Sequence, residues 1–249
     1  MVLLTTYCFF PTIVLAQFPG WQWSKNGSSS DVADIGHSVT MDASGNVYVT
    51  GYFESASITF GSITLTNADY TGTTADIFVV KYDPSGTVLW ANSYGEDMSS
   101  ERGNGISADP TTGDIYFTGY FWSSTITFGS TTLTNAGMCD MFVVKCNSAS
   151  TVLWAINAGG TNVDNSLAIS TDATGDVSVA GYFGGATITF GSTTLTNASS
   201  GTADLFVVKY NSAGDVYATG FFYGTTIVFG STTLTNASAG SADIFVVKV

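Results

Sequence analysis

One eight-residue phrase occurs four times in this chain of 249 residues. It reads ADIFVVKY at 75–82, CDMFVVKC at 139–146, ADLFVVKY at 203–210 and ADIFVVKV at 242–249. The first three copies are evenly spaced, with a period of about 64 residues, and only the last interval is shorter. A fixed period of this length indicates a repeat architecture, in which each unit buries its faces only by stacking against its neighbours.

Each complete unit contains four strand-like segments with tight turns. In the third copy three of them lie at 166–172, 177–183 and 204–210, and the fourth is seen in the second copy at 150–157. A Thr/Gly-rich excursion, 184–203 in the third copy, separates the second segment from the third. Four short strands in such a period are typical of a β-propeller blade, because a β-solenoid rung needs only about 20 to 30 residues. We predict an all-β, propeller-like fold of about four units, with an open stacked β array as the alternative.

The last unit is incomplete. Lys248 follows Lys209 too closely for a full period, and the deficit of about 25 residues falls after 209–214. The sequence there predicts one β-hairpin with its turn at Asn211–Gly214, in which 216–222 takes the place of a missing Trp-containing strand. The units are then about 17–90, 91–154, 155–210 and 211–249, in a single domain over 17–249.

The segment 1–16 is predicted to be a secretory signal peptide. It is mostly apolar, too short for a membrane span of roughly 20 residues, and ends in Val14-Leu15-Ala16, where small or aliphatic residues suit signal peptidase. No Lys or Arg precedes Lys25, so the usual basic region is missing. A wrongly assigned start codon and an apolar first strand are the alternatives. We expect a secreted or cell-surface protein with no membrane insertion after cleavage.

Several phrases carry a resemblance to a known family. GNVYVTGYF (45–53), ITFGS (58–62), DIFVVKYDPSGTVLWA (76–91) and GGTNVD (159–164) recur in fixed order. The chain resembles the repeat of secreted bacterial SBBP proteins, a predicted β-propeller family, and its strand order is similar to that of kelch blades. The resemblance covers roughly 21–249. It implies an extracytoplasmic, non-catalytic module of surface or adhesin-like proteins and supplies no catalytic residues.

Charge restricts the partners. With 6 Lys and Arg against 19 Asp and Glu, the net charge is −13, which repels nucleic acids and anionic membrane surfaces. We expect a protein or glycan partner at the cell surface, or copies of the chain itself. The function predicted is binding, adhesion or scaffolding. The alternative is a subunit of an extracellular fibre, assembled head to tail by β-strand complementation, and a carbohydrate-active propeller enzyme is third.

Catalytic and metal-binding patterns are scarce. His37 is the only histidine, and no nucleophile elbow, zinc-protease, phosphate-loop or CxxC motif occurs. We predict a protein without catalytic residues or cofactors. Asp42, Asp109 and Asp172 precede Gly-containing turns, where Asp bonds its own backbone; weak calcium binding is the alternative, although the spacing of a calcium loop is absent.

Other residues recur at fixed positions. Asp76, Asp140, Asp204 and Asp243 open one strand of each unit, which indicates a repeated hydrogen-bonding role at a blade corner. Trp23, Trp90 and Trp154 are interpreted as packing anchors, with sugar stacking by these and Trp21 as the alternative. Cys139 and Cys146 flank one strand too far apart to form a disulfide and read as packing residues. The acidic loop 95–103 is interpreted as a solvated face, and Asn26, Asn197 and Asn236 are candidate glycosylation acceptors.

The two ends of the chain match each other in pattern. The last strand of the chain, 244–249, lacks the Trp strand that follows it in complete units, and FPGWQWSKNG (18–27) resembles that strand. We therefore predict that the segment around Trp21–Lys25 pairs with the edge of Ile244–Val249, within one chain or between chains.

Overall fold

The computed structural model describes residues 22–27, 32–69, 73–197, 203–210, 216–222, 226–229, 232–235 and 243–248. The predicted signal peptide at 1–16 and Trp21 lie outside these residues. All regular elements of the described part are β-strands. That part of the chain holds no helix of the length and apolar character needed to cross a bilayer.

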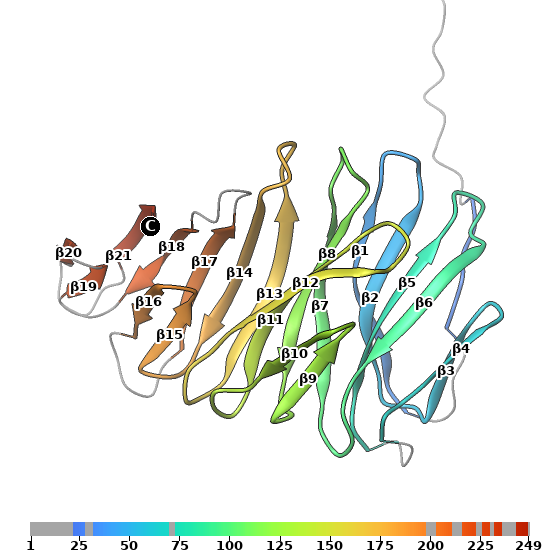
Figure 1. Ribbon diagram of the computed structural model, residues 1–249, viewed down its shortest axis with the longest axis horizontal. Helices are drawn as coiled ribbons and strands as arrows, with labels where there is room; N and C mark the ends of the chain where they lie inside the picture. The colour runs from blue at the N-terminus through green and yellow to red at the C-terminus, as the bar shows by residue number, and fades with distance from the viewer. Residues whose placement is uncertain are drawn as a thin grey trace, which may run out of the picture.

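Three larger antiparallel sheets follow one another along the longest axis (Figure 1). The first has the order β1 (Asp34–Met41), β2 (Val47–Phe53), β5 (Asp76–Tyr82), β6 (Val88–Tyr94). The second has the order β7 (Glu101–Ala108), β8 (Ile115–Phe121), β11 (Asp140–Cys146), β12 (Val152–Ala158). The third has the order β13 (Asp164–Thr171), β14 (Val177–Phe183), β17 (Asp204–Tyr210), β18 (Val216–Phe222), β21 (Asp243–Lys248). The predicted class, an all-β protein of repeated propeller-like blades, is confirmed.

The Thr/Gly-rich excursions form small β-hairpins that the sequence pattern had left unassigned. They are β3 (Ser57–Phe60) with β4 (Ile63–Thr66), β9 (Thr125–Phe128) with β10 (Thr131–Thr134), β15 (Thr187–Phe190) with β16 (Thr193–Thr196), and β19 (Thr226–Phe229) with β20 (Thr232–Thr235). In the first three a Gly-Ser pair makes the turn, and its glycine has a φ near +60°. Glycine adopts this angle without the steric cost of a Cβ, which allows a two-residue hairpin.

The incomplete last unit adds strands to the third sheet instead of forming a full sheet. β18 pairs antiparallel with β17, with Tyr210 opposite Val216, so the predicted hairpin is confirmed, while its turn at 211–215 lies outside the described residues. β21 then pairs with β18 as a fifth strand. Strand pairing requires only backbone groups, so β18 fills the fourth position although it carries no Trp.

The predicted pairing of the chain ends within one chain is wrong for the residues that are described; the form between chains stays a prediction. Residues 22–27, which we call the strap, lie against the first sheet: Trp23 Nε1 donates a hydrogen bond of 3.1 Å to the Pro84 carbonyl. The described partner of β21 is β18 in the third sheet, at the opposite end of the molecule (Figure 1). The strap does take the place of a Trp-containing strand, but on the upstream side of the first sheet. There Trp23 donates its hydrogen bond to the turn that contains Pro84.

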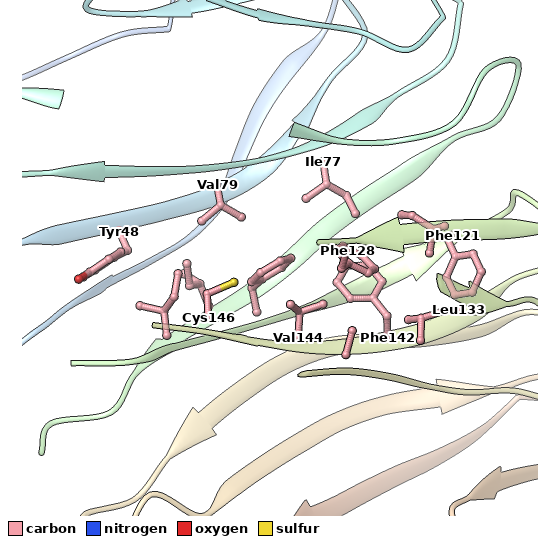
Figure 2. Close-up of a cluster of buried hydrophobic side chains, with 14 of the residues drawn as sticks. Tyr48, Ile77, Val79, Phe121, Phe128, Leu133, Phe142, Val144 and Cys146 are labelled. Atoms are coloured by element: carbon pink, nitrogen blue, oxygen red, sulfur yellow. The ribbon is translucent and has the colours of Figure 1, made fainter. Parts of the chain in front are cut away.

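The core lies in layers between successive sheets. Between the first and second sheets, Ile77 and Val79 pack against Phe117, Phe128 and other apolar residues (Figure 2). Between the second and third sheets, Met141 and Val143 pack against residues such as Phe183. A third cluster contains residues of the first sheet and of the β3–β4 hairpin, together with Trp23 of the strap. Within the described residues, two layers are therefore enclosed by two sheets each, and the third cluster has a sheet on one side only.

Candidate functional site

The face of the first sheet that points away from the second sheet is the candidate site. For every sheet, we call the face on this side, toward the preceding repeat, its upstream face. The face toward the following sheet is its downstream face. Val39 in β1 and Ile106 in β7 occupy the same repeat position, since each follows the β-bulge of its strand. By the same register, Met41 corresponds to Ala108.

These matched positions differ greatly in exposure. Val39 and Met41 are 66% and 64% exposed, whereas Ile106 and Ala108 are 4% and 9% exposed. The first sheet covers Ile106 and Ala108 in the complete layer. Along β1, the upstream face of the first sheet thus presents to solvent two apolar side chains at positions that are buried where the repeat is complete. Neighbouring apolar side chains that are exposed in this way mark a candidate interaction site.

The strap covers part of this face. The Trp23 ring lies 5.6 Å from that of Tyr82, and both residues line a hollow of about 250 Å³ together with Ile58, Phe60 and Phe78. One repeat later, Trp90 Nε1 donates to the Ser148 carbonyl at 3.2 Å, the counterpart of the bond from Trp23. Trp23 and Trp90 therefore occupy equivalent packing positions, and Trp154 packs against the layer between the second and third sheets.

The aspartates that open the third strand of each sheet are buried at a corner. Asp76 Oδ2 accepts the Ala68 N–H at 2.8 Å and Asp140 Oδ2 accepts the Ala136 N–H at 3.1 Å, the kind of role expected for them. A Cβ on Gly95 would collide with the Asp76 carboxyl group. Burial, with the charges of Glu101, Asp69 and Glu96, raises the pKa of Asp76 to about 7. Asp204 is also buried, and the side chain of Asp243 lies outside the described part.

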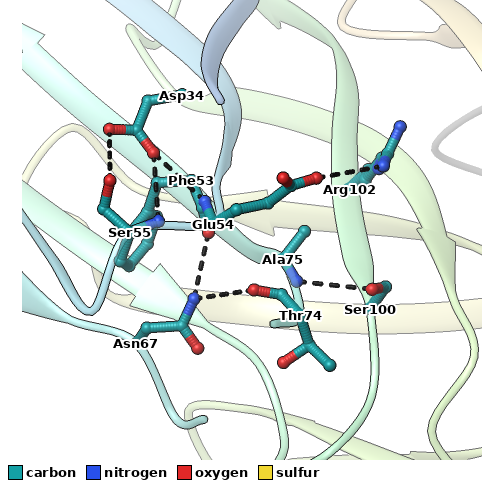
Figure 3. Close-up of polar contacts among 9 residues, drawn as sticks. All are labelled: Asp34, Phe53, Glu54, Ser55, Asn67, Thr74, Ala75, Ser100 and Arg102. Carbon is teal, nitrogen blue, oxygen red and sulfur yellow. Dashed lines mark hydrogen bonds and ion pairs between the residues drawn. The ribbon is translucent and has the colours of Figure 1, made fainter. Parts of the chain in front are cut away.

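A second series of acids, at the start of the first strand of each sheet, was missed by the sequence analysis. Asp34 accepts hydrogen bonds from the Glu54 and Ser55 amides (Figure 3). Its counterparts are Glu101 and Asp164, both 0% exposed. The interpretation of 95–103 as a solvated face is therefore wrong at Glu101, which accepts the amides of Glu96 and Ser123.

The first-strand acid of the third sheet has an altered pKa. Asp164 Oδ2 accepts the Gly160 amide at 2.6 Å. Burial, with the nearby charge of Asp140, raises the pKa of Asp164 to about 7. The phrase GGTNVD (159–164) ends on this residue and was the one sequence signal for the series.

The turn aspartates have a structural role. Asp42 accepts the amides of Ser44 and Asn46, and Asp109 and Asp172 accept amides two residues ahead in the same way. The hydrogen bond from the Thr174 hydroxyl, followed by that from Lys209, holds the pKa of Asp172 well below its usual range. Among the described residues, no three acidic, His or Cys side chains are grouped as metal ligands.

The remaining predicted residues are dispersed. His37 Nδ1 lies 3.1 Å from both the Gly103 carbonyl and Asn104 Oδ1, so it joins β1 to β7. Cys139 and Cys146 are free thiols in the core, as predicted. Asn26 is exposed in the strap. Asn236 lies outside the described residues.

Asn197 occupies a structural position of the repeat. Its counterpart Asn67 is 2% exposed, and Asn67 Nδ2 donates to the carbonyls of Phe53 and Thr74 (Figure 3). The next counterpart, Asn135, donates to backbone carbonyls as well. The position therefore holds loops together in the first and second repeats.

Trp122 was also missed by the sequence analysis. Its side chain is 42% exposed, and it lines a hollow of about 400 Å³ with Ser99, Ser100, Arg102 and Tyr120. The signal was available, because Trp122 stands where the first and third repeats have Glu54 and Gly184 and the fourth has Tyr223. A residue type that differs from one repeat to the next is not required by the fold that the repeats share.

Comparison with known proteins supports the repeat architecture. No family model matches the chain, so the resemblance to SBBP proteins stays a prediction. The chain is similar to an uncharacterized WD repeat-containing protein of Acanthamoeba polyphaga mimivirus, with 27% identity over 164 residues. The match covers 61% of this chain and 12% of that protein, so the chain spans a small part of its relative's length. Together, the stacked four-stranded sheets and this distant similarity describe a propeller-type repeat protein.

Proposed function

We propose that this chain is a non-catalytic scaffold that binds another protein through the upstream face of its first sheet. The observation that carries the proposal is the exposure of Val39 and Met41 at positions that are buried in the second sheet. Apolar side chains at such a density gain free energy when a partner removes them from water, at about 25 cal/mol per Å². A protein that works alone has no use for this surface.

The arrangement of the acids supports a non-catalytic role. Asp76 and Asp140 are buried, receive backbone N–H bonds and face the glycines of a neighbouring strand. Glu101 likewise receives two backbone amides. A catalytic carboxyl group needs reach to a substrate, whereas these groups fix loops at the corner of each sheet.

A photo-crosslinking amino acid at position 39 tests the proposal in the native host. We expect an adduct with a protein at position 39 and a much weaker one at Leu153, which is 49% exposed on β12 and serves as the matched control. Equal, background-level labelling at both positions would refute a binding role for the first sheet.

We propose a cell-surface location, supported by the apolar residues 1–16 that end in Val14-Leu15-Ala16. Secretion would leave Gln17 as the N-terminal residue. Mass spectrometry of the exported protein is the measurement, and an exported chain that still begins with Met1 would contradict cleavage.

Glycan binding is a second candidate function, favoured by the exposed Trp122 beside Ser99, Ser100 and Arg102. An exposed indole stacks on the apolar face of a sugar ring, and hydroxyl and guanidinium groups donate hydrogen bonds to its oxygens. We expect Trp122→Ala to abolish signals on a glycan array, while Trp90→Phe leaves them unchanged. An accompanying hydrolysis assay separates binding from a carbohydrate-active enzyme.

A further inference from the structure

Each of the two complete layers consists of two halves, the downstream face of one sheet and the upstream face of the next, and the two layers are built from equivalent residues. In the layer between the first and second sheets, Ile77 and Val79 of the downstream face share one buried cluster with Ile106 and Ala108 of the upstream face. In the next layer, Met141 and Val143 occupy the positions of Ile77 and Val79. The chain therefore shows twice how a downstream face fits an upstream face.

The upstream half of this layer has no sheet against it at the first sheet and is open only along β1. Its inner residues are buried and match those of the second sheet in order: Phe53, Ile58, Phe60, Phe78 and Val80 correspond to Phe121, Ile126, Phe128, Phe142 and Val144. The strap reaches one side of this face through Trp23. On β1, Val39 and Met41 stay exposed.

The downstream half stands uncovered at the third sheet. Leu205 follows Asp204 as Ile77 follows Asp76 and Met141 follows Asp140. It is 40% exposed, whereas Ile77 and Met141 are 0% exposed. The neighbouring Lys209 side chain is 31% exposed, compared with 20% for its counterpart Lys145.

We propose that the occupant of the upstream face is a second copy of this chain, whose β13, β14 and β17 cover β1 of the first. This inference rests on the proposed function and names its partner. Leu205 and Val207 of one copy then join Val39 and Met41 of the next in one apolar cluster, as Ile77 and Val79 share a cluster with Ile106 and Ala108. A second copy is the partner whose surface is known to fit, since the chain itself contains both halves of the layer.

Backbone contacts between sheets extend the match. Thr40 Oγ1 accepts the Ala108 N–H at 3.3 Å, and Ser107 Oγ accepts the Thr171 N–H at 3.0 Å. Ser170 of the third sheet holds the same position as Thr40 and Ser107 and is exposed. In the proposed contact its hydroxyl accepts the N–H of Met41 in the next copy.

The contact is heterologous, because two different faces meet. Such an interface leaves one face of each kind free at the ends of a pair, so it continues into a chain of copies unless a ring closes. Stacking of sheets thereby replaces strand complementation as the route to head-to-tail assembly. The net charge of −13 opposes it, so salt that screens the charges should strengthen it.

Two single variants test this arrangement by sedimentation velocity of the purified chain over 1 to 200 µM. We expect the wild-type mass to rise with concentration, and more steeply at 0.5 M than at 0.15 M NaCl. Val39→Asp and Leu205→Asp should each weaken association at least about 100-fold, since each places a carboxylate in an apolar contact. Leu153→Asp, an equally drastic change on an exposed leucine, should leave it intact. Melting temperatures verify that each variant folds, and Val39→Asp changes a side chain that is already 66% exposed.

Mixing the two variants gives the decisive result. Val39→Asp keeps an intact third-sheet face and Leu205→Asp keeps an intact first-sheet face, so an equimolar mixture should form heterodimers and nothing larger. A mixture that stays monomeric, while the wild type associates, would overturn the proposed pairing of faces. A wild type that is monomeric at 200 µM in both salts would overturn self-association altogether. A crosslink from position 39 to a different protein would overturn it too and leave the scaffold function standing.

Discussion

Replacing Asp164 by Asn should change how the stability of the chain depends on pH. Asp164 is 0% exposed at the start of β13, and its pKa is raised from 3.8 to about 7 by burial and by Asp140. Between these values the native state holds a proton that the unfolded chain has released. Stability therefore falls as pH rises from about 4 to about 7, and stays at the lower level above that.

The magnitude follows from the two pKa values. Their difference multiplied by 1.36 kcal/mol per pH unit gives about 4 kcal/mol as the upper limit of the loss. The Asn side chain is neutral at every pH and keeps an oxygen that can accept the Gly160 N–H. About 1.6 kcal/mol of this loss has already occurred at pH 5, so we expect Asp164→Asn to gain about 1 to 2.7 kcal/mol relative to the wild type between pH 5 and pH 8.

Guanidinium denaturation of both proteins at pH 5 and pH 8 measures this difference. Asp172→Asn is the matched control: its pKa is lowered in the folded chain, so its contribution is lost only as pH falls below about 4. If Asp164→Asn and the wild type lose the same free energy of unfolding between pH 5 and pH 8, burial does not hold the proton on Asp164 and the reasoning is wrong.

Three further outcomes are expected. Phe142→Ala, at a 0% exposed position of the layer between the first and second sheets, should lower the free energy of unfolding by about 3 to 5 kcal/mol in denaturant titrations; a loss below about 1 kcal/mol would contradict the packing. Trp90→Phe keeps an aromatic ring but removes the hydrogen bond to the Ser148 carbonyl, so calorimetry should show that the free energy of unfolding falls by about 1 kcal/mol. An unchanged free energy of unfolding would show that this bond does not stabilise the chain. Chelation by EDTA should leave the melting temperature unchanged, since calcium that binds the native chain would stabilise it; a fall of more than about 5 °C would show that the Asp-Gly turns bind metal.

The repeat made most of the fold predictable. The strands predicted at 177–183 and 204–210 coincide with β14 and β17, because the alternating apolar residues there face two layers. The small hairpins were missed, although the Gly-Ser pair between β-branched residues is a hairpin signal. Their Thr-rich strands resemble loops in sequence because only three apolar residues of the third hairpin, Ile188, Phe190 and Leu195, are buried there, together with Thr193.

The site was less predictable than the fold. Exposure depends on what lies next to a strand, so Val39 and Ile106 look alike in sequence while one is exposed and the other is buried. Glu101 stands among charged and polar residues, and composition cannot tell a buried acid from its solvated neighbours. The ends of the chain were paired wrongly for a related reason: a matching sequence identifies the kind of position that Trp23 fills, but not which of the equivalent layers it joins.

Layers that are built alike make the number of repeats a quantity that the gene can change in single steps. Unequal recombination between two copies of the repeated unit adds or removes a whole layer, and each remaining contact is one that the fold already contains. A shorter deletion, such as the one that brings Lys248 closer to Lys209 in the sequence, is absorbed because β18 pairs with β17 through backbone groups alone. Selection on such a gene can act on the length of the array before it acts on any single side chain.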